Sequence, residues 1–191
     1  MRLFTITFSI LILIAGTGSS VYFINPYNVT SASISERIFG IHLYKIPSRS
    51  MQPILKPRDY IVVSTIAYKN QQPKKMDVIV FFRIENLEEK VPYVKRIIAL
   101  ENDSIKIDEG EVIVNNKKLN EPYVNIDNRV TPYSLTMKET IVPLGKVFVL
   151  GDNRDNSSDS RKFGFIKVSN IIGKVNYILY GENGRSGNKI E

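Results

Sequence analysis

The chain has 191 residues, of which 43% are hydrophobic and 24% are charged, a balance that favours a folded core and excludes wholesale disorder. It contains no Cys and a single His. This excludes disulfide scaffolds, thiolate zinc sites, iron–sulfur clusters, Cys nucleophiles and His-rich metal sites. The formal net charge of +7 suits a negatively charged partner, either a nucleic acid or an anionic membrane surface.

The N-terminal segment is strongly apolar. The stretch Leu3–Phe23 carries no charge, and a helix of that length is about 31 Å long, which matches the hydrocarbon core of a membrane. A cleaved signal peptide, with small residues at Gly16–Ser20 as its cut site, is the open alternative. Either interpretation implies export. We expect residues 1–27 to form a membrane anchor with a short cytoplasmic tail, and residues 28–180 to lie outside.

Residues 28–180 are predicted to form a mainly β, mostly antiparallel domain behind one transmembrane helix. Short runs rich in Val and Ile recur between Pro and Gly turn signals, and no helical periodicity is sustained after residue 40. The dipeptide Asn115-Asn116 predicts a tight hairpin. The predicted strands are Tyr60–Ser64, Val78–Phe82, Val94–Leu100, Ser104–Asp108, Glu111–Val114, Thr140–Val142, Lys146–Leu150 and Ile171–Leu179.

Two segments are polar and lack strand patterns. Residues 115–139 are predicted to form an irregular insertion or a long loop on the sheet. Residues 181–191 form a polar C-terminal tail, which we expect to fray.

Three segments carry residues suited to chemistry. In Ile46–Leu55 two serines flank Arg49 between two prolines, which restrict the backbone; a solvated turn is the alternative. In Tyr93–Ile98, strand alternation places Lys95 on one face with Tyr93 and Ile97. Burial there would lower the pKa of its amine, whereas an exposed edge-strand lysine is the alternative.

The third segment, Gly151–Arg161, follows an apolar strand and is dense in Asp, Asn and Arg. A calcium loop of the EF-hand type is rejected, because Lys162 stands where the bidentate Glu is required. Interleaved Arg residues favour a salt-bridged turn, with a generic solvated loop as the alternative.

Together these segments resemble bacterial signal peptidase I, a membrane-anchored serine protease with a Ser/Lys dyad that removes signal peptides from exported proteins. The resemblance runs from the N-terminal anchor to about Tyr180. It rests on the nucleophile segment Pro47–Pro53, on a strand entry at Arg58–Val63, on the lysine segment Tyr93–Ile98, and on Gly151–Arg161 along its whole length.

The resemblance implies a role for each matching residue. Ser50 would be the nucleophile and Lys95 the general base, with no cofactor and no metal. The Ser50 amide and the Ser48 hydroxyl would stabilise the oxyanion, and Ser157 would orient the Lys95 amine. The implied supporting ion pairs, which would stiffen the loop that carries Ser157, involve Asp152, Arg154, Asp159, Arg161 and Arg96. The implied substrate pocket is lined by Ile46, Met51, Leu55, Tyr93 and Val94.

The implied substrates are signal peptides with small residues at the first and third positions before the cut. The implied location is the bacterial inner (cytoplasmic) membrane, with a single-pass anchor, the catalytic domain on the extracytoplasmic side, and contact with anionic lipid. The alternative is a pilin-processing Ser/Lys peptidase of conjugative transfer. A non-enzymatic anchored β domain is a second rival, but no nucleic-acid platform of interleaved aromatic and basic residues is visible. His42 is interpreted as structural.

The chain departs from the family pattern at a few positions. Arg49 stands between the two serines where Gly is usual, and Arg58 stands where Gly usually opens a Gly-Asp pair. Ile54 replaces the usual Thr. The usual Gly-Leu-Pro-Gly-Asp run after the lysine strand is Ala99-Leu100-Glu101-Asn102-Asp103 in this chain. Alternation predicts that the Arg49 side chain points away from the face of Ser48 and Ser50.

Overall fold

The structure is a computed structural model that describes residues 34–85, 89–125, 127 and 130–190. The predicted membrane anchor and cytoplasmic tail, residues 1–27, lie outside these ranges. Within the described part of the chain, no helix is both long enough and apolar enough to cross a membrane.

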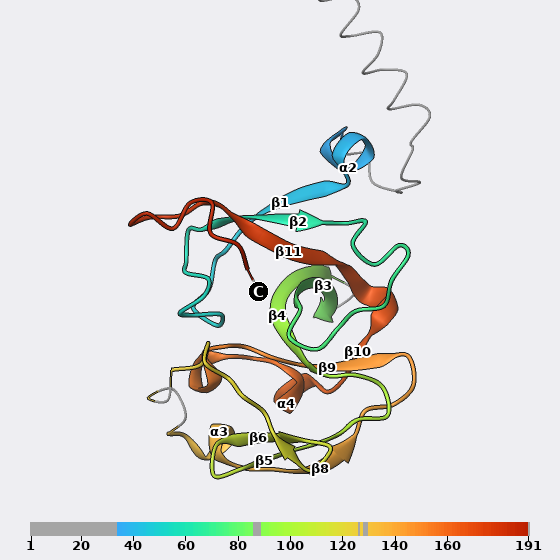
Figure 1. Ribbon diagram of the computed structural model, residues 1–191, viewed down its shortest axis with the longest axis vertical. Coiled ribbons are helices and arrows are strands. Elements are labelled where there is room, and N and C mark those ends of the chain that lie inside the picture. The colour runs from blue at the N-terminus through green and yellow to red at the C-terminus, as the bar shows by residue number, and fades with distance from the viewer. Residues whose placement is uncertain (1–33, 86–88, 126, 128–129, 191) are drawn as a thin grey trace, which may run out of the picture.

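The larger of two sheets has seven strands in the order β1-β2-β11-β3-β4-β9-β10. Each pairing is antiparallel, which confirms the predicted mainly antiparallel β domain. Strands β3 and β4 form a hairpin across the middle of the domain (Figure 1). The strands are β1 (Ile41–Lys45), β2 (Tyr60–Ser64), β3 (Val78–Glu85), β4 (Glu89–Ala99), β9 (Lys146–Leu150), β10 (Ile166–Lys167) and β11 (Ile171–Tyr180).

The smaller sheet has the order β7-β6-β5-β8 and lies at the opposite end of the molecule from β1 and β2 (Figure 1). Its buried residues pack with Ile98, Phe148 and Leu150 of the larger sheet, so one apolar core joins the two sheets. The predicted hairpin is confirmed, because Asn115 and Asn116 both have positive φ, as a tight turn of this kind requires. The strands are β5 (Ser104–Asp108), β6 (Glu111–Val114), β7 (Lys117–Lys118) and β8 (Met137–Ile141).

Helices in the described residues are short and connect the strands. The two sheets therefore provide most of the core, and the candidate catalytic residues lie on strands and loops. The helices are α2 (Ile34–Phe39), α3 (Pro132–Leu135) and α4 (Ser160–Phe163), with 3-10 turns η2 (Arg154–Asn156) and η3 (Val168–Asn170).

Strand prediction succeeded for four short runs rich in Val and Ile. β2, β5, β6 and β9 have the predicted bounds. β4 begins five residues before its predicted start, because Pro92 interrupts the pattern and yet lies opposite Phe82 in the ladder. β1 and β10 were not predicted: β1 is partly exposed along its whole length, and β10 has only two residues. Residues 115–139, predicted as irregular, contain β7, α3 and the start of β8.

The expectation that the tail frays is wrong. Residues 181–190 turn back along β11, where Ile190 N donates to Asn176 O at 2.9 Å and Lys189 forms a bridge with Tyr177. The Ile190 side chain is only 6% exposed and packs in the core. The segment was judged by its polar composition as a whole, whereas one apolar residue near its end, Ile190, anchors the segment to the core.

Arg58 has a φ of 74°, in the left-handed region that favours glycine. We expect Arg58→Gly to raise the free energy of unfolding by about 0.5–1 kcal/mol, because relief of the strain exceeds the added chain entropy. Arg49→Gly is the matched control in the same loop, since Arg49 is not among the residues with positive φ. The control should lower the free energy of unfolding by about 0.5–1 kcal/mol. Urea unfolding of both variants measures the difference, and equal losses would contradict the strain at Arg58.

Candidate active site

Ser50 lies in the connection from β1 to β2, called here the Ser50 loop (residues 46–59). The chain turns tightly after Ser50, because Leu55 N donates to Met51 O at 2.9 Å. Met51 and Leu55 are fully buried and fix the turn to the core. The Ser50 side chain is therefore held at the edge of the core, with the residue 8% exposed.

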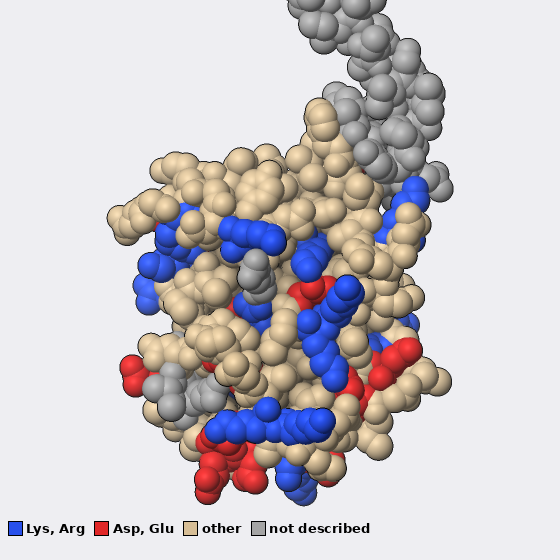
Figure 2. Space-filling view, viewed as in Figure 1, with Lys and Arg blue, Asp and Glu red and all other residues tan. Residues whose placement is uncertain are grey.

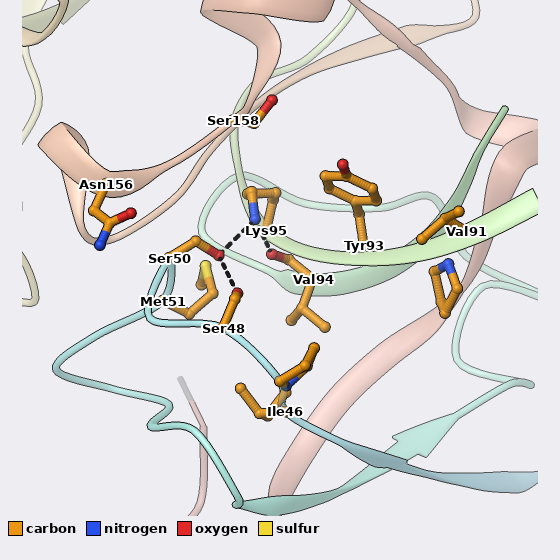
Figure 3. A pocket seen from close by; sticks show the side chains of 12 residues that line it. Ile46, Ser48, Ser50, Met51, Val91, Tyr93, Val94, Lys95, Asn156 and Ser158 are labelled. Atoms are coloured by element: carbon orange, nitrogen blue, oxygen red, sulfur yellow. Dashed lines mark hydrogen bonds between the residues drawn. The ribbon is translucent and has the colours of Figure 1, made fainter. Parts of the chain in front are cut away.

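Lys95 lies in the middle of β4 and is 3% exposed. Its Nζ donates hydrogen bonds to Ser50 Oγ at 2.8 Å and to Val94 O at 2.8 Å, and it stands 5.4 Å from the centre of the Tyr93 ring. Figure 3 shows that the Lys95 side chain extends from β4 and directs its amine to Ser50 Oγ and to the Val94 carbonyl oxygen. The predicted pair of Ser50 and Lys95 therefore meets in space across 45 residues of sequence.

The surroundings of the amine control its charge. Desolvation by burial lowers the pKa of Lys95 to about 8, while the charges of Asp159 and Asp152 oppose that shift. The dominant cause is the loss of water around a charged amine. An amine with a pKa of about 8 is partly neutral, and so able to accept a proton, near physiological pH.

Ser48 Oγ lies 3.2 Å from Ser50 Oγ (Figure 3). Ser48 itself is exposed, so its hydroxyl is open to a molecule that approaches Ser50. The two serines and the lysine thus place three polar side chains around one point.

The segment Gly151–Arg161, called here the 151–161 loop, packs directly against the Ser50 loop. Asn153 N donates to Ser50 O at 3.1 Å. A Cβ at Gly151 would lie 2.5 Å from Ser50 O and 2.2 Å from Ser157 Oγ, distances that no side chain tolerates. Glycine at position 151 is therefore required for the two loops to approach each other.

Buried ion pairs hold the 151–161 loop. Two pairs join residues predicted as supporting charges: Arg96 Nη2 lies 2.9 Å from Asp152, and Arg161 Nη2 lies 2.8 Å from Asp159. Their side chains are almost fully buried, so removing one partner leaves an uncompensated charge in the core. These pairs fix β4 and α4 to the loop beside Ser50.

A third pair has a partner that the sequence did not indicate. Arg154 pairs with Glu121, and both side chains are 2% exposed. Glu121 comes from residues 115–139, a polar stretch in which the sequence gives no sign that this acidic residue is buried. Tyr123 in the same stretch donates to Glu121 at 2.9 Å and stacks its ring 4.0 Å from the Arg96 guanidinium.

The structure does not support the predicted role of Ser157. Its Oγ is buried and has no hydrogen-bond partner among the described residues, while the Lys95 amine donates to Ser50 and to the Val94 carbonyl instead. The family resemblance correctly matched a serine at position 157, but it did not show that the hydroxyl packs against Gly151.

A cavity of about 360 Å³ opens beside Ser50 and Lys95. Four of the five predicted pocket residues line it: Ile46, Met51, Tyr93 and Val94. The fifth, Leu55, does not, because the turn after Ser50 directs it into the core. Arg49 is exposed and is not a lining residue.

Sequence reasoning missed other parts of the cavity wall. Asn156 and Ser158 of the 151–161 loop also line the cavity (Figure 3). The family motif contained both residues, and only the folding of that loop beside the cavity shows which of its residues line the wall. The remaining lining residues that were not predicted are Pro47, Val91 and Pro92.

His42 lies away from this site. It forms a hydrogen bond with Glu36 of α2, and its ring centre is 4.4 Å from that of Tyr44. Within the described ranges, no group of three or more His, Cys, Asp or Glu side chains is arranged to hold a metal ion.

The geometry suits nucleophilic chemistry. A hydroxyl becomes a nucleophile when a nearby base removes its proton, and a lysine whose pKa is lowered by burial is such a base. The hydroxyl faces a cavity, and a second hydroxyl stands beside it to stabilise negative charge.

Comparisons with known proteins point to one family. The family model described as "Signal peptidase, peptidase S26" matches residues 29–180. The chain is 38% identical over 151 residues to signal peptidase I of Bacillus caldolyticus, covering 74% of this chain and 80% of that protein. It is 35% identical over 152 residues to signal peptidase IB of Staphylococcus aureus, covering 73% and 78%. A solved signal peptidase I from Enterococcus faecalis is 28% identical, covers 55% of this chain and 97% of its own, and gives a TM-score of 0.46.

Proposed function

Since the chain belongs to the signal peptidase family, peptidase S26, we propose that it is a membrane-bound serine endopeptidase that cuts signal peptides from exported preproteins. The observation that supports the proposed mechanism is the 2.8 Å hydrogen bond between the buried Lys95 amine and the Ser50 hydroxyl, beside a cavity.

In the proposed reaction, neutral Lys95 takes the proton of the Ser50 hydroxyl as Ser50 Oγ bonds to the scissile carbonyl carbon. The protonated amine then gives that proton to the leaving nitrogen, and the peptide bond breaks to leave an acyl-enzyme. Lys95 next takes a proton from water as the water oxygen bonds to the ester carbon. It gives that proton to Ser50 Oγ as the bond between Oγ and the acyl carbon breaks, which releases the second product and restores the neutral amine.

Burial makes this lysine an effective base. At pH 7, an amine with a pKa of about 8 is neutral in about one molecule in ten, whereas an ordinary lysine with a pKa of about 10.4 is neutral in about one in 2,500. Desolvation thus raises the reactive population by more than two orders of magnitude. The tetrahedral oxyanion would receive hydrogen bonds from the Ser50 amide and the Ser48 hydroxyl.

The cavity wall explains the proposed preference for small residues. Ile46, Met51 and Val94 present apolar surfaces close to the dyad, and a volume of about 360 Å³ must hold several substrate residues. Bulky side chains before the cut would overlap with this wall, so small residues at the first and third positions are favoured.

We further propose that residues 1–27 anchor the enzyme in the bacterial cytoplasmic membrane, with the catalytic domain on the extracytoplasmic side. The net charge of +7 favours an anionic lipid surface, where each Lys or Arg close to the headgroups contributes about 1 kcal/mol. Lys and Arg side chains occur at several places on the face seen in Figure 2.

The test of the function is cleavage of a peptide that carries Ala-X-Ala before the cut. Ser50→Ala should lower kcat by at least about 10³-fold, because no hydroxyl remains to form the acyl-enzyme. The variant should stay folded, since Ala keeps the Cβ of Ser50 and only the hydroxyl is removed. Fluorescence of a quenched peptide measures turnover, and thermal unfolding checks the fold. Activity above a few per cent would transfer the nucleophile to another residue, with Ser48 the first to examine.

The role of Lys95 predicts a pH profile. Below the pKa the amine is charged and cannot accept a proton, so kcat/KM should rise about tenfold per pH unit up to about pH 8 and then level off. Lys95→Arg should be inactive at every pH tested, because a guanidinium keeps its proton. An active Arg variant would mean that position 95 needs only positive charge.

Arg49→Gly should change turnover by less than tenfold and leave the substrate preference unaltered, because Arg49 is exposed and does not line the cavity. Both forms are compared on peptides that differ only in the charge next to the cut, below the melting temperature of either. A preference for acidic neighbours that disappears in the Gly variant would instead make Arg49 a specificity residue.

A further inference from the structure

The segment of residues 181–190, called here the tail, lies beyond residue 180, the last residue of the family match. It runs antiparallel to the end of β11: Gly187 N donates to Ile178 O at 2.7 Å, and Ile178 N donates to Asn188 O at 2.9 Å. In Figure 1 the tail turns back from the end of β11 toward the body of the domain. The tail is thus an ordered part of the fold, held to β11 by backbone hydrogen bonds.

Arg185 joins the tail to the Ser50 loop. Its Nη2 donates to Asp59 Oδ2 at 2.7 Å and to Ile54 O at 2.6 Å, and its Nη1 donates to Asp59 Oδ1 at 3.1 Å. Ile54 lies in the turn that begins at Ser50, so the guanidinium holds that turn by its backbone. Both charged side chains are largely buried, which makes the pair less accessible to screening by salt.

Asp59 closes the loop at its base. The residue is 2% exposed, and its carboxylate also accepts a hydrogen bond from Lys56 N at 2.7 Å. Its backbone oxygen accepts from Ile46 N at 2.8 Å, so the first and last residues of the Ser50 loop are tied together there. Without Arg185 this buried carboxylate would lose its counter-ion, and the structure around it would have to relax.

The tail also supports the loop from the core. Ile190 packs in the same apolar cluster as Ile46, Met51 and Leu55. Two of these residues, Ile46 and Met51, line the cavity. The tail therefore contacts the Ser50 loop both through a buried ion pair and through apolar packing beneath it.

The dyad depends on the position of this loop. Lys95 is fixed in the middle of a strand, whereas Ser50 stands on a loop, and their 2.8 Å contact is kept only if the loop holds its place. A displacement of about 1 Å between reacting groups can cost on the order of 10²-fold in rate. Elements that hold the Ser50 loop consequently act on catalysis without touching substrate.

We propose that the tail positions the Ser50 loop, with Arg185 as a positioning residue for Ser50 and Ile190 as the apolar support. The proposal rests on the function proposed above for Ser50 and Lys95. It gives a catalytic task to a segment outside the part of the chain that matches the signal peptidase family.

The experiment compares Arg185→Ala and Arg185→Lys in the full chain with the parent. We expect Arg185→Ala to lower kcat by about 10–100-fold with little change in KM, since the cavity wall on β4 is untouched. The pH midpoint should stay where it is, because the burial of Lys95 is unchanged. Arg185→Lys keeps a positive charge beside Asp59. Its loss of kcat, expressed as a logarithm, should be at most half of the loss in Arg185→Ala.

The matched control is Lys75→Ala, which removes an ion pair with Asp103 next to the smaller sheet, away from the Ser50 loop. It should leave kcat unchanged at temperatures where it is folded. If Arg185→Ala keeps kcat within twofold of the parent, or if the control loses as much, the positioning role is overturned. Should Arg185→Ala fail to fold, Arg185→Lys and Ile190→Val decide the question by the same kinetic measurements.

Hydrogen exchange without substrate separates this proposal from the function itself. Backbone amides of Met51–Leu55 should exchange at least about tenfold faster in Arg185→Ala than in the parent, while those of β4 do not change. Unaltered exchange in the loop would overturn the tail's hold on it. If exchange speeds up but the parent cleaves no signal peptide, the proposed function fails and the tail's effect on the loop stands.

Discussion

The structure around the candidate site depends on one costly feature, a lysine amine buried in the middle of β4. Removing water from Lys95 disfavours its charged form and lowers its pKa. The amine is left with two hydrogen-bond partners, Ser50 Oγ and Val94 O. One of these belongs to its own strand and is always present. The other must be brought by a loop, so the surrounding structure has to fix that loop against the strand.

Three sets of contacts meet this requirement. Below the loop, Met51 and Leu55 pack into the apolar core. Beside it, the 151–161 loop approaches within a distance that only glycine at position 151 allows, and Asn153 N bonds to Ser50 O. The 151–161 loop is in turn fixed by buried pairs of Arg and Asp or Glu. Such pairs are costly to break and specify one arrangement, which a proton-transfer geometry needs.

Local patterns in the sequence were sufficient for much of the fold. Short runs rich in Val and Ile predicted β2, β5, β6 and β9, and the family resemblance carried by three motifs predicted that Ser50 and Lys95 act together. The errors concern contacts that depend on three-dimensional packing. Nothing local shows that Leu55 turns into the core or that Glu121 is buried against Arg154. The tail was misjudged for the same reason, because a single apolar residue, Ile190, decides its course.

The departures from the family's glycines divide into two kinds. Arg58 and Asn102 have φ values of 74° and 65°, so the backbone keeps the conformation that glycine adopts most easily. Asn tolerates that region better than Arg does, because its short side chain can bond to the local backbone. Arg49 has no such conformation, so the backbone beside Ser50 does not need glycine for its torsion. The Arg49 side chain is exposed and stays outside the cavity, so it leaves the space beside the dyad open.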